Sequence, residues 1–257
     1  MRTTLFCYSA TGNSFYVATE LAKKLGDTTI VTLPTDKEIT ISEQVGIIAP
    51  VYALFPPQAI TDFITKQLGK ADLSEMKYLF CIHTYCTLAG YAPLLTELCL
   101  QDIGCLSSYQ NKIQMPGTYI PLYDVASQVK IDKLYAKADE KLKKIASDIQ
   151  NEKLRLSFKL PFAKLCKYHL MPITQRTFSS TDENFTVNDN CNGCGQCERF
   201  CPAHNITIVE GKPQFNHACY SCFGCYHRCS KHAIEYKKKK RGYYPNLRSH
   251  YEESYRK

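Results

Sequence analysis

Eight cysteines in the C-terminal third of this 257-residue chain form two runs with one spacing, C-x2-C-x2-C-x3-C. The runs consist of Cys191, Cys194, Cys197 and Cys201, followed by Cys219, Cys222, Cys225 and Cys229. Each cysteine of the second run follows its counterpart by 28 residues, and the same offset relates His204 to His232 and Ile206 to Ile234. The region is therefore an internal duplication of one short unit.

This spacing is the bacterial signature for two [4Fe–4S] clusters, in which the fourth cysteine of each run binds the cluster of the other run. It predicts one cluster on Cys191, Cys194, Cys197 and Cys229, and a second on Cys219, Cys222, Cys225 and Cys201. Gly193 and Gly195 would let the first loop adopt positive φ. The second run departs modestly from the first, because Ser230 stands where the first has Pro202.

Disulfides and zinc are the alternative uses of so many thiols. Disulfides suit secreted chains, and no secretory apolar segment is evident. Zinc sites more often use pairs of C-x2-C knuckles. The other six cysteines are expected to pack as small buried hydrophobes; they are Cys7, Cys81, Cys86, Cys99, Cys105 and Cys166. Free thiols in this number favour a reducing, cytoplasmic setting, and exposed-type clusters favour an anaerobic organism. No run is long enough to span a bilayer.

The net charge of +8 is unevenly distributed. Its excess lies in a C-terminal tail that contains the basic run 237–241, next to an acidic cysteine-rich region. One short basic run is weak evidence for nucleic-acid binding, so none is expected. A solvated tail is favoured, and docking to an acidic redox partner is the intermediate possibility.

A loop at the N-terminal end offers donors for an anion. It follows a predicted strand, Thr3 to Tyr8, and precedes an amphipathic helix that continues to Leu25. Its polar and glycine positions are Ser9, Thr11, Gly12, Asn13 and Ser14. Hydroxyls and backbone N–H groups at a helix N-terminus can hold a phosphate. An ordinary capped turn would use the same residue types, so both interpretations stay open here.

Two further loops follow predicted strands and are rich in aromatic residues. The first follows the apolar strand 45–51 and contains Pro50, Val51, Tyr52 and Phe55. The second follows the strand 78–82, begins at His83, and contains Thr84, Tyr85 and Gly90. Together with the phosphate-type loop they suit a flat ring that carries a phosphate tail. Each aromatic residue taken alone fits ordinary packing equally well.

Strands and helices alternate along residues 1–150. Further strands are expected at 29–33 and within 106–113, and helices at 58–68, 93–103 and 131–149. This order predicts an α/β fold with a doubly wound, five-stranded parallel sheet, whose ligands lie beyond the carboxyl ends of the strands. The irregular segment 115–129 has three interpretations: a lid over the ring, a docking surface for the second domain, or a segment that packs against the edge of the sheet.

The same patterns divide the chain into four parts. Residues 1–150 form the α/β domain, 151–181 an interdomain connection without clear periodicity, 182–238 a small α+β cluster domain, and 239–257 the basic tail.

The chain resembles the flavodoxin–ferredoxin fusion proteins of anaerobic bacteria and archaea. The flavodoxin part is similar in Ser9-Ala10-Thr11-Gly12-Asn13-Ser14, in Pro50-Val51-Tyr52 and in the loop 84–90, and the ferredoxin part in all eight cysteines. The resemblance implies a flavodoxin-like fold and FMN, with its phosphate at Thr11 to Ser14 and its ring between the Tyr52 and Tyr85 loops. No tryptophan is present, so tyrosine would have to stack on the ring.

These features predict an electron-transfer protein that relays electrons between two [4Fe–4S] clusters and FMN, with a redox partner protein and a possible homodimer. No catalytic acid, base or nucleophile stands out, and His83 is a weak candidate for a proton donor. Two alternatives remain: an FMN-dependent reductase of a small molecule that is fed by the clusters, and a non-catalytic iron–sulfur redox sensor.

Overall fold

The computed structural model describes residues 1–156, 161–237 and 242–244, and the chain forms two units. Unit 1 contains Met1–Ser9, Asn13–Pro116 and Ser127–Met171, and unit 2 contains Ala10–Gly12, Gly117–Ala126 and Pro172–Lys257. The expected domain boundaries at 150, 181 and 238 stay predictions. Of the expected basic tail only residues 242–244 lie within the described ranges, and of the basic run only Lys237 does.

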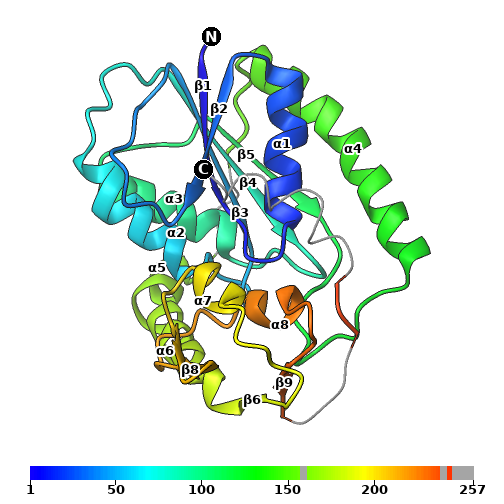
Figure 1. The fold of residues 1–257 in the computed structure, drawn as a ribbon. Coiled ribbons are helices and arrows are strands. Elements are labelled where there is room, and N and C mark those ends of the chain that lie inside the picture. Colours follow the sequence, from blue (N-terminus) through cyan, green and yellow to red (C-terminus); the bar gives the residue numbers. More distant parts are fainter. Residues whose placement is uncertain (157–160, 238–241, 245–257) are drawn as a thin grey trace. The chain divides into compact units, whose positions relative to one another are not determined.

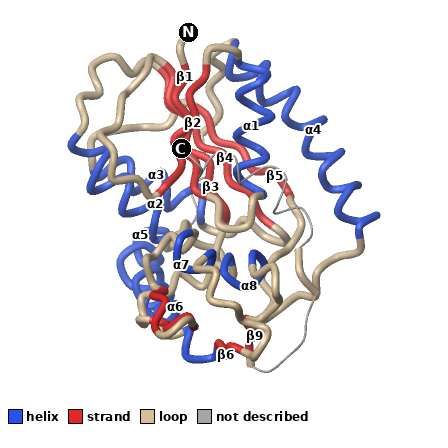
Figure 2. Tube along the Cα trace, in the orientation of Figure 1, coloured by secondary structure: helices blue, strands red, loops and turns tan. Residues whose placement is uncertain are grey.

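Unit 1 is built on a five-stranded parallel sheet (Figures 1 and 2). Its strands are β1 (Thr3–Tyr8), β2 (Thr28–Leu33), β3 (Gln44–Pro50), β4 (Tyr78–Tyr85) and β5 (Tyr109–Gln114). They lie side by side in the order β2-β1-β3-β4-β5. This is the doubly wound order of flavodoxin-like sheets, so the predicted fold class is confirmed. The switch in strand order falls between β1 and β3.

Helices cover both faces of this sheet. They are α1 (Asn13–Leu25), α2 (Gln58–Asp62), α3 (Ala92–Asp102) and α4 (Gln128–Gln150). Figure 1 shows α1 and α4 on one face and α2 and α3 on the other. A π-helical turn, Phe63–Gln67, and a 3₁₀ turn, Leu68–Lys70, continue α2. Sheets covered in this way bury both faces of their central strands, and every residue of β1 is buried accordingly.

Packing across the sheet requires a glycine in β3. A Cβ atom at Gly46 would lie 2.4 Å from the Phe80 ring and 2.6 Å from the Leu5 side chain. Both of these side chains are fully buried. Because the position has no side chain, the neighbouring strands can carry a large aromatic and a large aliphatic residue.

The structure differs from the sequence prediction at the end of β4. The strand continues to Tyr85 rather than ending at Ile82, because His83 and Thr84 pair with β3 at Ala49 and Pro50. Polar residues are not strong strand signals, so only the pairing with neighbouring strands reveals the longer element.

A second difference lies in the expected connection. Three helical segments follow residue 162, where the sequence predicted irregular structure; they are α5 (Ala163–Leu165), the π-helical turn η3 (Cys166–Leu170) and α6 (Met171–Ser179). Cys166 and Met171 pack with Leu95 in a small buried cluster. Lys167 donates a hydrogen bond of 2.7 Å to the Leu98 carbonyl and pairs with Asp102. Tertiary contacts with α3 therefore order a segment of weak intrinsic pattern.

The described residues of unit 2 form two short antiparallel strand pairs and two short helices, and they include α6 from Pro172 onward. Strand β6 (Phe185–Val187) pairs with β9 (Ile234–Tyr236), and β7 (Ile206–Val209) pairs with β8 (Lys212–Phe215). The helices are α7 (Gln196–Arg199) and α8 (Gly224–Arg228), and a 3₁₀ turn, Thr181–Asn184, precedes β6. A small core joins these pieces; its buried members are Ile120, Phe185, Phe223, Tyr226 and Ile234. Among the described residues, no helix is both long and apolar enough to cross a membrane.

Candidate functional site

The two cysteine runs of unit 2 share a backbone conformation. Gly195 (φ 71°) and Phe223 (φ 55°), which are 28 residues apart, precede α7 and α8, and Gly193 (φ 67°) and Ser221 (φ 54°) occupy the corresponding earlier position. Glycine adopts this conformation freely, whereas serine and phenylalanine pay about 1–2 kcal/mol. In the second run, burial of Phe223 offsets this cost.

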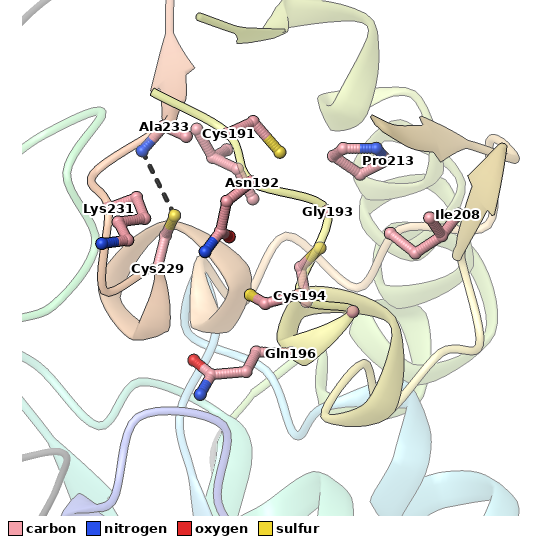
Figure 3. A pocket seen from close by; sticks show the side chains of 13 residues that line it. Cys191, Asn192, Gly193, Cys194, Gln196, Ile208, Pro213, Cys229, Lys231 and Ala233 are labelled. Atoms are coloured by element: carbon pink, nitrogen blue, oxygen red, sulfur yellow. Dashed lines mark hydrogen bonds between the residues drawn. The ribbon is translucent and has the colours of Figure 1, made fainter. Parts of the chain in front are cut away.

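The first predicted ligand set surrounds one pocket (Figure 3). The pocket is lined by Cys191, Cys194 and Cys197 from the first run and by Cys229 from the second. Figure 3 shows Cys191, Cys194 and Cys229 around it, with Lys231 at the side. Cys194 is exposed and the other three are half-buried. A cysteine of the second run thus lies beside three cysteines of the first.

The second predicted set has no exposed member, because all four of its cysteines are half-buried. Burial raises the pKa of the Cys222 thiol to about 12, and the charge of neighbouring Cys201 adds to the increase. Burial also raises the pKa of Cys225 well above its ordinary value, and the next contributions come from Cys222, Cys219 and Cys201. The first set shows the same effect at Cys197, whose pKa is raised by burial to about 11. Buried thiols held close together must lose their protons when they bind metal.

Backbone amides point at three of these sulfurs. The N–H groups of Asn205 and Ala233 donate to Cys201 Sγ (3.3 Å) and Cys229 Sγ (3.2 Å), which are equivalent positions of the two repeats. The Ser221 N–H donates to the Cys219 sulfur at 3.2 Å. Such hydrogen bonds stabilise thiolate charge and tune the potential of a bound cluster.

The remaining thiols are distributed as the sequence predicts, with one exception. All fourteen cysteines, each within the described ranges, are free. Five of the six outside the runs are buried, and Cys86 is half-buried. Within the described ranges, no three His, Cys, Asp or Glu side chains are gathered as closely as a single metal ion would require.

In unit 1, the loops after β3 and β4 lie against each other. The Val51 N–H donates to the Thr84 carbonyl at 2.9 Å. Gly90 has φ 52°, and a Cβ atom there would lie 2.4 Å from Leu54 Cβ. These two candidate loops are therefore adjacent, and only glycine fits at their closest approach.

The turn that carries Tyr52 and Phe55 is strained. The two residues exchange backbone hydrogen bonds of 2.9 Å, and the intervening Ala53 and Leu54 both have positive φ. Two-residue turns of this kind usually contain Asn or Gly. Both aromatic side chains are half-buried, and so is Tyr85 at the end of β4. Strain that persists beside partly exposed aromatic rings points to a functional loop.

The donors of the phosphate-type loop are buried and already have protein partners. Ser9 is buried at the end of β1, and Ser14 Oγ lies 2.7 Å from Thr84 Oγ1. The Asn13 amide donates to the Pro116 carbonyl at 2.8 Å, and its oxygen accepts from Tyr135. Within unit 2, Thr11 Oγ1 lies 3.0 Å from Thr118 Oγ1. Gly12 has φ 91° and provides the turn.

His83 lies within the sheet of unit 1 and not at an exposed strand end. Its side chain is 1% exposed, and Nε2 lies 3.0 Å from Thr96 Oγ1 on α3. Burial lowers its pKa to about 4. This environment is that of a structural histidine, and it does not favour the proton-donor hypothesis.

Comparison with known families finds one match, the 4Fe–4S binding domain, at residues 186–207. These residues contain the whole first cysteine run, and the second run follows them. The chain joins a flavodoxin-like sheet to a segment that matches the 4Fe–4S binding domain. The matched residues extend from β6 to the start of β7.

Solved structures with a partial likeness include flavodoxins. A Megasphaera elsdenii flavodoxin is 14% identical over 54% of this chain and 98% of its own (TM-score 0.37). A WrbA-like flavodoxin from Agrobacterium tumefaciens is 13% identical over 59% and 99% (TM-score 0.38). The chain spans only 36% of a flavodiiron core from Synechocystis, at 16% identity over 56% of its own length (TM-score 0.38). No curated protein matches the chain. The strand order of the sheet, and not these partial superpositions, identifies the fold.

Proposed function

We propose that this protein carries electrons on two [4Fe–4S] clusters and an FMN. The observation that supports the cluster part most directly is the pocket that Cys229 shares with Cys191, Cys194 and Cys197. A fourth ligand taken from the other run is the arrangement of two-cluster ferredoxins. Cys201 would complete the second set with Cys219, Cys222 and Cys225.

The residues present fit such clusters. Eight thiols are provided, the sulfurs of Cys201, Cys219 and Cys229 accept backbone N–H groups, and most of the surroundings are apolar. Each cluster would supply a site that gains or loses one electron. The protein would hold the sulfurs in place, limit access of water and set the potentials through hydrogen bonds and burial.

The FMN part is supported by three loops that follow strands of the five-stranded sheet. They follow β1, β3 and β4, which are neighbours in the sheet, and a ligand of a doubly wound sheet lies at the switch between β1 and β3. We assign the flavin ring to the Tyr52 and Tyr85 loops, and the phosphate to Thr11, Gly12, Asn13 and Ser14. The hydroxyl and amide donors suit a phosphate, and the half-buried tyrosines suit a flat apolar ring.

The function would be a relay. FMN exchanges one or two electrons, so together with one-electron clusters it can link single-electron and two-electron chemistry. A redox partner protein would deliver or receive the electrons. A cytoplasmic location and a possible homodimer stay predictions.

The decisive experiment is anaerobic purification with iron, sulfide and flavin measured on one sample. We expect about eight iron and eight sulfide ions and one FMN per chain. Cys194→Ala should halve the iron, whereas the control Cys105→Ala, outside both runs and 8% exposed, should retain it. A colourless protein, or zinc in place of iron, would contradict the proposal. Turnover of a small molecule by the loaded protein would favour the reductase alternative.

A further inference from the structure

The surroundings of the two cysteine sets of unit 2 are not equivalent. Cys194 of the first set is exposed, and the exposed cation Lys231 lines the pocket of that set. All four cysteines of the second set are half-buried. A cluster that accepts an electron gains negative charge, and burial disfavours that charge more than an exposed setting does.

A carboxylate is buried next to the second set. Asp182 is 2% exposed as a residue, and its side chain is completely buried. It accepts hydrogen bonds from Asn205 Nδ2 (2.7 Å) and the His217 N–H (3.0 Å), and His217 Nδ1 lies 3.1 Å from its other oxygen. Two N–H donors and an imidazole nitrogen therefore surround this carboxylate.

Asp182 links the two chain segments that provide ligands to this set. Asn205 follows Cys201 and donates its backbone N–H to the Cys201 sulfur, and His217 precedes Cys219. The Asn205 side-chain oxygen also accepts from Ala218, so both segments are fixed to each other.

The duplication does not reproduce this arrangement around the first set. The counterpart of Asn205 is Ala233, which keeps the N–H to sulfur bond but has no side-chain amide. The counterpart of Asp182 is Glu210, which is exposed in the turn between β7 and β8. The buried carboxylate is thus a feature of one repeat only.

A neighbouring cation acts in the opposite direction. The positive charge of Arg228 lies near Cys222 and favours negative charge at its sulfur. Its guanidinium group also donates to the Ala10 carbonyl at 2.9 Å and lies 4.9 Å from the centre of the Phe200 ring. Arg228 therefore places a positive charge near Cys222, whereas the carboxylate of Asp182 lies near Cys201 and Cys219.

We propose that Asp182 is a positioning residue that makes the cluster on Cys219, Cys222, Cys225 and Cys201 the harder one to reduce. The inference rests on the proposed function, since it requires both clusters. A fixed negative charge in a buried site opposes the added electron. At the other cluster, the exposure of Cys194 and the positive charge of Lys231 favour reduction. Electrons would then rest on the first cluster.

The test is an anaerobic redox titration of the full chain, followed by electron paramagnetic resonance. In Asp182→Asn the charge is removed and the side-chain size is kept. At the lower midpoint of the parent protein, the ratio of reduced to oxidised cluster should rise about tenfold, which is 59 mV for one electron. The midpoint potential of the other cluster, the higher of the two, should not change. The control Glu183→Gln removes an adjacent exposed carboxylate and should change neither couple.

A second variant tests the order of the clusters without altering Asp182. Cys194→Ala removes the first cluster, and the remaining couple should be the lower of the two. The inference is wrong if Asp182→Asn leaves the lower midpoint potential unchanged, or shifts both midpoint potentials equally. It is also wrong if the cluster that remains in Cys194→Ala has the higher midpoint potential. Counts of iron and of unpaired spins in the parent protein distinguish failure of this inference from failure of the proposed function. Fewer than two clusters per chain would contradict the proposed function itself.

Discussion

At the scale of single residues, His83 shows how position changes the role of a titratable group. It lies between β3 and β5 in the register of the sheet and contacts Thr96 on α3. Burial lowers its pKa from 6.5 to about 4, so the imidazole is neutral in the folded protein at ordinary pH. The group therefore affects stability rather than catalysis.

The pH dependence of this group follows from linkage. Between pH 6.5 and 4 the unfolded chain binds a proton at His83 that the folded chain does not bind, so stability falls as pH falls through this window. The loss should approach about 3 kcal/mol, since each pKa unit corresponds to about 1.4 kcal/mol. Denaturation followed by circular dichroism should show a smaller pH slope in His83→Gln, and the parent slope in the exposed control His169→Gln. Equal slopes in all three proteins would refute this role.

Gly90 provides a second test at the residue scale. Gly90→Ala introduces a Cβ atom 2.4 Å from Leu54 Cβ and must separate the two aromatic loops of unit 1. The matched control is Gly104→Ala, which has φ 75° but no atom within 4 Å of the new Cβ. In both variants, alanine at a positive φ should lower the free energy of unfolding by about 1 kcal/mol. Only Gly90→Ala should also weaken FMN binding, as measured by flavin fluorescence on titration; equal flavin affinity in the two variants would count against the assigned ring site.

At the scale of elements, the two cysteine runs adopt the same backbone conformation with different residues. The first repeat uses glycine at 193 and 195, and the second uses Ser221 and Phe223 with similar positive φ. The Ser221 hydroxyl accepts from Thr181 at 3.1 Å, and Phe223 packs against Tyr119 and Phe185. Local strain in the second repeat is therefore balanced by packing, whereas the first repeat avoids it.

This contrast predicts different costs for two similar substitutions in the first loop. A Cβ atom at Gly193 would lie 2.7 Å from the Gly211 carbonyl oxygen, whereas one at Gly195 meets nothing closer than Glu198 Oε2 at 3.9 Å. Gly193→Ala should therefore lower the stability of unit 2 by more than the about 1 kcal/mol expected for Gly195→Ala. Thermal denaturation of the reconstituted proteins measures the difference, and a smaller loss in Gly193→Ala would be inconsistent with the tight loop contact.

At the scale of the whole molecule, the two units differ in how much packing supports them. Unit 1 has a five-stranded sheet with helices on both faces, and unit 2 has strands of three or four residues and a core of five buried residues. Such small units usually need a metal or a disulfide to be stable. The clusters would supply that stability in unit 2.

Removal of iron should therefore affect the units differently. We expect anaerobic chelation to abolish the slow amide hydrogen exchange of residues 185–236 and to leave the exchange of β1, β3 and β4 unchanged. Hydrogen exchange followed by mass spectrometry resolves the two sets of peptides. Protection of residues 185–236 that survives complete loss of iron would show that packing alone holds this unit together.

Sequence by itself determined the elements with strong periodic or repeated signals. Apolar runs and helix patterns predicted five strands, the helices between them and the doubly wound sheet, because burial of both sheet faces leaves a clear imprint on residue type. The 28-residue repeat predicted two ligand sets. The four cysteines of the first set line one pocket, and both ligand sets stay predictions.

Only the tertiary structure revealed features that arise from contacts between distant residues. The extension of β4 depends on pairing with β3 and β5, and the helical segment after residue 162 depends on packing against Leu95. Asp182 has no motif, since its burial and its bonds to Asn205 and His217 exist only once three distant segments meet. The residue types along the chain reflect which positions are buried and which backbone conformations they adopt. The environment of one buried charge depends instead on the folded chain around it.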